Sequence, residues 1–452
     1  MNDKYSRRLL YMHHRKEVWQ LAWPLMLSNL ALPIFGLVDT AVLGHLDSPH
    51  YLGAVAIGSN LIMFLFWGFG FLRMGTTGVT AQFFGRSDPL KVLATLAQSI
   101  LAGVIISFFL ITIQHIYFDA GLSFMSASDQ VSIFAREYLN IRIYSAPAIL
   151  TTYAFIGWFI GQQNTRIPLV IFIVTNAINI IFDLVFVIGL GWGVKGAALA
   201  SLIAEYSGLL IAIYFSKQYF RKINPYELIH YIFVKKQFVR LLAINQNIFL
   251  RTILLLFSFI YFTKQGAKFG DIVLAANAVL INFLFLISHG LDGFAHASEA
   301  LTGKAIGQNN IKRFYGSVRS AGEFSFFMAL LLSLFFFFFG VRIILLLTNI
   351  HEVANQAIQY LPWIIALPLL SFIGYLLDGV FIGTTKSIAM RNSMVLSVLF
   401  VFIPLSILLE DFGNNGLWFS FSMLMLARSL SMASYYWYYS RTQAWLDPGN
   451  RM

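Results

Sequence analysis

Long apolar runs alternate with short polar segments along the whole of this 452-residue chain. A helix needs about 20 mostly apolar residues to cross a bilayer. The pattern contains twelve such runs and predicts an all-α polytopic membrane protein with twelve transmembrane helices. The predicted helices are 17–44, 51–84, 91–117, 131–161, 167–189 and 195–216 in the first half, and 240–263, 271–304, 315–347, 353–383, 389–409 and 416–439 in the second.

The two halves of the chain repeat each other in sequence. At an offset of 222 positions, many residues of the first half meet the same residue type in the second half, and this offset holds without a gap over more than a hundred residues. Because each half holds an even number of helices, we expect a parallel repeat, with a pseudo-twofold axis along the membrane normal. The matched pairs include Ala54 and Ala276, Asn60 and Asn282, Gly68 and Gly290, Gly85 and Gly307, Tyr153 and Tyr375, and Gly157 and Gly379.

This repeat predicts two six-helix lobes and a substrate site near the midplane, either between the lobes or inside one of them. The basic loop between the halves is the expected linker. The predicted boundaries are an N-terminal tail at 1–16, a first lobe at 17–216, a linker loop at 217–239, a second lobe at 240–440 and a C-terminal tail at 441–452.

Composition agrees with a membrane protein and excludes several classes of enzyme. Hydrophobic residues make up 58% of the chain and charged residues only 11%, which is too little charge to cover a soluble surface. The chain has no cysteine, so thiol catalysis and thiolate metal sites are excluded. No Walker-type glycine loop, HExxH motif or nucleophile–base pair is present. We therefore expect neither an enzyme nor a protein with a bound cofactor or metal.

The distribution of positive charge predicts the topology. The net charge is +11, and 22 of the 31 lysines and arginines fall in one alternating set of connections, which includes both termini, while 3 fall in the other set. Basic loops stay on the cytoplasmic side. We therefore expect both termini in the cytoplasm and a bacterial inner-membrane location. The excess of basic residues reflects this topology, and we expect no nucleic-acid partner.

Ionisable residues inside predicted spans are costly and mark candidate functional sites. Asp39 lies in the first helix, which also contains Pro24, a residue that removes a backbone hydrogen bond and permits a bend. Asp183 lies in the fifth helix, where Asn176, Asn179 and Asp183 share one face. A carboxylate among amides in a dry cavity can exchange protons, as proton coupling requires. The alternative is that these amides only bridge neighbouring helices.

The predicted eighth helix carries four ionisable residues on one face, namely His289, Asp292, His296 and Glu299. Such spacings can share a divalent ion, but one helix cannot complete the coordination. We therefore prefer a polar patch that lines the second lobe, and Asp378 of the tenth helix could face it.

Basic residues within the spans could neutralise these carboxylates. Arg73 and Arg251 are candidate counter-charges, and an ion pair, snorkelling or contact with substrate are the open alternatives for each. Arg428 is expected to snorkel toward the cytoplasmic end of the last helix. Glu205 is interpreted as structural.

Several segments resemble a known family. WPLMLSNLALPIFGLVDTAVLGHLDSPHYLGAVAIG is similar to the first two helices of the multidrug and toxic compound extrusion (MATE) family. FLRMGTTGVTAQFFGR, LDGFAHASEALTGKAIGQ and DGVFIGTTKSIAMRNSM resemble its DinF-like branch. The resemblance covers nearly the whole chain. It implies twelve helices in two lobes and an antiporter that exports amphipathic or cationic drugs by alternating access, driven by inward flow of protons or sodium.

The resemblance also assigns residues to this mechanism. It implies that Asp39 and Asp183, together with Asn179, form the proton-coupling site. Ser201 stands where related sequences often have threonine, and Pro24 matches the bend of the family's first helix.

Other readings of the same resemblance stay open. Sodium-coupled relatives place a carboxylate at the position of Asp378, so a sodium-coupled exporter is one alternative. A lipid-linked precursor flippase of the same superfamily is another, although only Arg73 and Arg251 are candidates inside the lobes for binding pyrophosphate. The expected partners are small substrates and the lipid bilayer, and we expect a monomer.

Overall fold

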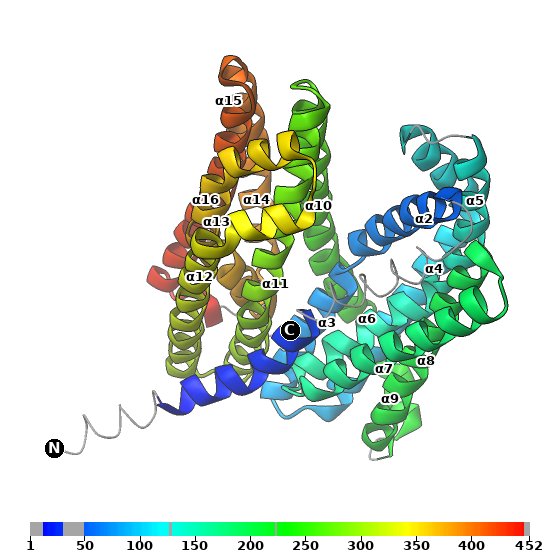
Figure 1. Ribbon diagram of the computed structural model, residues 1–452. Coiled ribbons are helices and arrows are strands. Elements are labelled where there is room, and N and C mark those ends of the chain that lie inside the picture. Colours follow the sequence, from blue (N-terminus) through cyan, green and yellow to red (C-terminus); the bar gives the residue numbers. More distant parts are fainter. Residues whose placement is uncertain (1–11, 30–48, 126–128, 222–223, 447–452) are drawn as a thin grey trace. The chain divides into compact units, whose positions relative to one another are not determined.

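A computed structural model describes residues 12–29, 49–125, 129–221 and 224–446, and every regular element in these ranges is helical. The chain divides into two compact units. One unit is Leu27–Leu241, and the other joins Met1–Met26 to Leu242–Met452. Figure 1 shows the helices in sequence colours.

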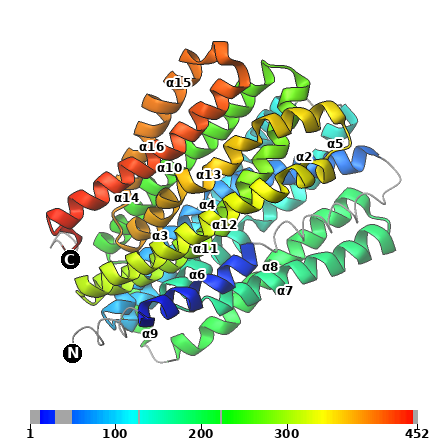
Figure 2. The same ribbon diagram turned by 60° about the vertical axis from the view of Figure 1, so that its left-hand side comes forward.

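Among the described residues, eight α-helices lie wholly within the unit Leu27–Leu241. They are α2 (Pro49–Gly68), α3 (Phe71–Gly85), α4 (Pro89–Met125), α5 (Asp129–Arg142), α6 (Ala146–Gly161), α7 (Arg166–Asp183), α8 (Gly193–Phe220) and α9 (Pro225–Ile232). A 3-10 turn at Ile143–Ser145 joins α5 to α6, and a π-helix at Leu184–Gly189 follows α7. α7 and α8 pack side by side, as Figure 2 shows.

The other unit contains the helices of the second half of the chain. Its helices are α10 (Lys235–Ala267, which begins in the first unit), α11 (Asp271–Gly307), α12 (Ile311–Leu347), α13 (His351–Gly383), α14 (Ser387–Val395), α15 (Ile403–Leu408) and α16 (Gly413–Arg441). A π-helix at Leu396–Phe402 joins α14 to α15, and 3-10 turns lie at Glu410–Phe412 and Ala444–Leu446. Residues 12–29 form a helix whose part up to Met26 belongs to this unit.

The helical pattern predicted from sequence is confirmed, with two breaks that the pattern did not show. In the part of the chain that the structure describes, ten helical segments are long and apolar enough to cross a membrane. The predicted helix 51–84 is interrupted between α2 and α3, where Phe69 and Gly70 form a turn. The predicted helix 131–161 tightens into the 3-10 turn before Pro147, which has no N–H to donate. The predicted first helix, 17–44, is described only as far as residue 29.

The sequence repeat is also a repeat of structure. Shifting α4 by 222 positions gives the bounds of α12, and the same shift takes the span α5–α6 onto α13. The close packing is repeated as well. A Cβ on Gly157 would collide with the carbonyl oxygen of Arg73, and a Cβ on the matching Gly379 would collide with the carbonyl oxygen of Ala295. In both units, therefore, a glycine lets the paired helices approach until their backbones touch.

The N-terminal helix packs against the second half of the chain. Arg313 of α12 donates a 2.6 Å hydrogen bond to Glu17, and Arg15 lies 4.0 Å from Glu323. Gly293 of α11 leaves no room for a Cβ against Met26. This contact explains why residues up to Met26 group with the second half. The lobe boundaries at 17–216 and 240–440 remain a prediction.

Large apolar side chains cover the outside of the helices, as expected for contact with lipid. The phenylalanine run of α12 is an example. Phe336 is buried and stacks on Phe283 at a centroid distance of 4.9 Å, whereas Phe337 and Phe338 are exposed. One side of the helix thus packs in the unit's core while the other side is available to acyl chains.

Candidate functional site

Asp183 is buried at the point where α7 ends and the π-helix Leu184–Gly189 begins. A π-helix widens the turn and shifts the residues that follow, and such segments often occur at functional sites. The buried carboxyl group of Asp183 therefore lies at the junction between an α-helix and a π-helix. Asp39, the other predicted coupling carboxylate, lies outside the described residues.

The side chain of Asp183 is held by its predicted neighbour. Asn179 donates a 2.9 Å hydrogen bond from Nδ2 to Oδ2 of Asp183, and the same amide lies 3.4 Å from Oγ of Ser201 on α8. Asp183, Asn179 and Ser201 thus form one cluster. Asn176 uses its amide within its own helix, where it donates to the carbonyl oxygen of Phe172 at 2.8 Å.

Two residues of α5 that sequence reasoning missed join this cluster. The buried Tyr138 interacts with Ser201 and Arg142, and its hydroxyl lies in the electrostatic field of Asp183. Arg142, one helical turn after Tyr138, donates a 2.8 Å hydrogen bond from Nη1 to Oγ of Ser145. The available signal was an arginine four residues after a tyrosine inside a predicted span, since residues at this spacing share a helix face.

A second group of charges lies in the same unit. The charge of Arg142 acts on Glu205 of α8, and the charges of Glu205 and Arg73 both act on the half-buried Tyr153 of α6. Glu205, interpreted as structural from the sequence, and Arg73 therefore belong to a set of interacting charged residues. The first half thus combines Asp183 and Glu205 with two arginines.

In the second half, the centre of the polar network is Asp378 of α13. Nη2 of Arg251 on α10 and Nη2 of Arg428 on α16 both donate to Oδ2 of Asp378, and all three side chains are buried. For Arg251 the ion pair considered from the sequence is present. The expectation that Arg428 snorkels toward the membrane surface is wrong, because its guanidinium points inward to this carboxylate and lies 5.2 Å from the ring of Tyr375.

The polar patch of α11 divides into two parts. Asp292 accepts a 3.4 Å hydrogen bond from Ser288 and lies within electrostatic range of Arg251 and Arg428, the two arginines that bind Asp378. His289, by contrast, places Nδ1 2.6 Å from the carbonyl oxygen of Phe285 in its own helix.

His296 and Glu299 form the other part of this patch. Nδ1 of His296 lies 3.6 Å from Oε2 of Glu299, whose side chain is fully buried. Within the described ranges, no three His, Asp or Glu side chains are grouped so that they could hold a metal ion.

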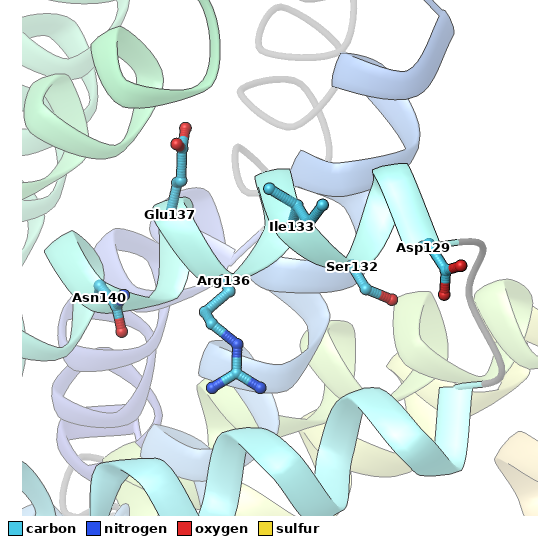
Figure 3. A pocket seen from close by; sticks show the side chains of 6 residues that line it. All are labelled: Asp129, Ser132, Ile133, Arg136, Glu137 and Asn140. Atoms are coloured by element: carbon cyan, nitrogen blue, oxygen red, sulfur yellow. The ribbon is translucent and has the colours of Figure 1, made fainter.

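One cavity of about 500 Å³ lies along α5 and is open to the outside. Figure 3 shows its lining, with Arg136 and Glu137 pointing to opposite sides of the helix. Arg136 pairs with Asp119, and Glu137 lies 3.6 Å from Nζ of Lys195. Neither Asp183 nor Asn179, the predicted coupling residues that the structure describes, lines this cavity. Its six lining residues are Asp129, Ser132, Ile133, Arg136, Glu137 and Asn140.

Comparison with known proteins supports the resemblance. The MatE family profile matches residues 24–185 and 248–408, one segment in each half. The chain is 39% identical to DNA damage-inducible protein F of Escherichia coli (strain K12) over 95% of this chain and 94% of that protein. It is 25% identical to the probable multidrug resistance protein NorM of Bacillus anthracis, covering 89% of this chain and 90% of that one.

Solved structures share the fold. An outward-facing multidrug resistance MATE family transporter of the MOP superfamily superposes with a TM-score of 0.83 at 18% identity, covering 96% of each chain. A MOP superfamily transporter from Pyrococcus furiosus superposes with a TM-score of 0.84, also at 18% identity and 96% of each chain. Together with the family profile and the identity to the Escherichia coli protein, the two-unit helical fold shows that this chain belongs to the MATE family of membrane transporters, in its DinF-like branch.

Proposed function

We propose that this transporter exports amphipathic or cationic compounds across a bacterial inner membrane in exchange for protons, by alternating access. The observation that carries the proposal is the buried carboxyl of Asp183, which accepts a hydrogen bond from the amide of Asn179. That amide in turn lies 3.4 Å from Oγ of Ser201. The probable multidrug resistance protein of Bacillus anthracis is a relative whose name points to the same class of substrate.

Asn179 can serve both states of Asp183. When the carboxylate is ionised, the amide donates to it from Nδ2, as in the structure. When Asp183 is protonated, rotation of the amide presents Oδ1 of Asn179 as an acceptor for the new hydroxyl. The hydroxyl of Ser201 can both donate and accept a hydrogen bond, so it can pair with the amide of Asn179 in either orientation. Protonation would in this way reorient side chains on α7 and α8 together, and Asp39 is proposed as the second coupling carboxylate. We propose Pro24 as the hinge of the first helix.

Proton coupling at the first half is favoured over sodium coupling at Asp378. A sodium ion requires an oxygen-rich site with negative potential, but Asp378 already receives the guanidinium groups of Arg251 and Arg428. The ion would have to displace a cation from the carboxylate. The same contacts weigh against the flippase alternative, because Arg251 and Arg428 are engaged with a carboxylate and are not turned to a phosphate.

The test is dye efflux from proteoliposomes with a proton or a sodium gradient imposed separately. We expect a proton gradient alone to drive efflux and Asp183→Asn to abolish it, because the amide keeps the shape of the side chain but cannot titrate. Asp271→Asn, an exposed carboxylate at the start of α11, is the matched control and should leave efflux unchanged.

A second matched pair separates coupling from packing. Asn179→Ala should slow proton-driven efflux. Asn176→Ala removes an amide that donates to a carbonyl oxygen of its own helix, so it should have a smaller effect. Efflux that depends on sodium alone, or that survives in Asp183→Asn, would contradict the proposal.

A further inference from the structure

The connection between the two halves contains a short helix, α9, with apolar residues on two opposite sides. Leu228, Tyr231 and Ile232 are partly buried against α4. Tyr226, Ile229 and Phe233 occupy the other side, since these spacings fall on one helix face. Their exposed fractions are 84% for Tyr226, 55% for Ile229 and 73% for Phe233. Full exposure of such a stripe to water would be unfavourable, so it requires a partner surface.

The contacts of α9 with α4 hold it at one end of the membrane spans. Nε2 of the buried Gln98 donates to the carbonyl oxygens of Tyr231 at 3.4 Å and Ile232 at 3.0 Å. Nζ of Lys91 lies 5.6 Å from the centre of the Tyr231 ring. Lys91 and Gln98 are two helical turns apart, about 10 Å along the axis near the start of α4. The C-terminal end of α9 therefore lies beside the first turns of a spanning helix.

The two helices that flank α9 in the sequence also place it at an end of the membrane spans. α8 and α10 are both candidate membrane spans, and α9 lies in the short connection between them. Both views place α9 at the end of α8 (Figure 1 and Figure 2). The segments that flank α9 carry the exposed cations Lys217, Arg221, Lys235 and Lys236. An apolar stripe between cationic segments is complementary to an anionic lipid surface, with its acyl chains beneath the headgroups.

We propose that α9 is an interfacial helix that binds anionic lipid. The stripe of Tyr226, Ile229 and Phe233 inserts at the boundary between headgroups and acyl chains. Lys217, Arg221, Lys235 and Lys236 contact the lipid phosphates. The inner side of α9 stays attached to α4, so the connection between the halves is held at the membrane surface and not free in water.

The chain has no cysteine, so a single introduced cysteine can be spin-labelled without first removing any native cysteine. The variants Ile229→Cys and Glu227→Cys are compared in proteoliposomes, using collisions with oxygen, which concentrates in lipid, and with a water-soluble nickel complex. We expect the label at position 229 to collide mainly with oxygen. Glu227 is exposed on the same helix but outside the stripe, so its label should collide mainly with nickel.

Two outcomes at position 229 would overturn the proposal. Nickel access equal to that at position 227 would mean that the stripe faces water. Protection from both collision agents would mean that protein covers it, for example a second copy of the chain.

The role of charge is tested with vesicles of phosphatidylcholine alone and vesicles that also contain phosphatidylglycerol. The label at position 229 should lie deeper in the second kind, and the combined change Lys235→Gln with Lys236→Gln should remove most of that difference. Equal depth in both kinds of vesicle would refute binding of anionic lipid.

Discussion

The two arginines on Asp378 lead to a strong prediction about stability. One carboxylate oxygen accepts from Arg251 and Arg428, and all three side chains are buried. Asp378→Asn keeps the shape of the side chain but removes its negative charge. Two buried guanidinium groups then lie close together without this carboxylate, although Asp292 remains within electrostatic range of both.

The size of the effect follows from the burial. Removing one partner of a buried ion pair costs about 3–5 kcal/mol, because it leaves an uncompensated charge in a medium of low dielectric constant. A loss of this size lowers the melting temperature of a domain of about 200 residues by roughly 10 °C. The loss should be partly recovered in Asp378→Asn combined with Arg428→Gln, which removes one of the two remaining charges.

The melting temperature of each variant can be measured in detergent from intrinsic tryptophan fluorescence during heating, since the chain has nine tryptophans. Asp271→Asn is again the control and should change the unfolding free energy by no more than about 0.5 kcal/mol, as is usual for exposed positions. If Asp378→Asn and the parent protein have the same melting temperature, the carboxylate does not neutralise these arginines. If the variant also loses sodium-driven efflux, Asp378 is an ion site and our argument against sodium coupling is wrong.

Two further predictions concern packing and pH. Gly379→Ala should destabilise the protein by about 1–3 kcal/mol or more, because the new Cβ meets the backbone of Ala295 and the helices must separate. Gly68→Ala is its control, because a Cβ there would meet no neighbouring atom of the described residues within 4 Å, and equal melting temperatures for the two variants would contradict this account. Burial, followed by the charge of Arg313, lowers the pKa of His14 below its usual 6.5, although Glu17 partly opposes this. Since the folded state prefers neutral His14, the contribution of this residue to the stability of the fold is complete above pH 6.5 and is lost as the pH falls through the lowered pKa. His14→Phe should therefore reduce the loss of melting temperature between pH 7.5 and 5.5, and an unchanged pH profile would exclude His14 as its source.

Much of the architecture could be read from the sequence because it depends on properties that act along the chain. Long apolar runs predicted the spans, since a helix in lipid must satisfy its own backbone hydrogen bonds. The 222-position repeat predicted two similar halves, and the matching bounds of α4 and α12 confirm it. The breaks between α2 and α3 and between α5 and α6 were less visible, because a glycine or proline is also tolerated within a transmembrane helix.

The pairing of side chains was decided by the tertiary structure. In a membrane, lipid-facing residues are as apolar as buried ones, so periodicity does not show which side of a helix faces its neighbours. The sequence singled out Asp183, Asn179 and Asp378 as ionisable or polar residues within spans, but it could not bring Tyr138 and Arg142 to Ser201 and Asp183. For the same reason Arg428 was expected at the surface, whereas the packing of α16 against α13 directs it to Asp378. The sequence by itself determined where the apolar helical spans form and where the charges lie along them, and only the packing of the helices decided which charges meet.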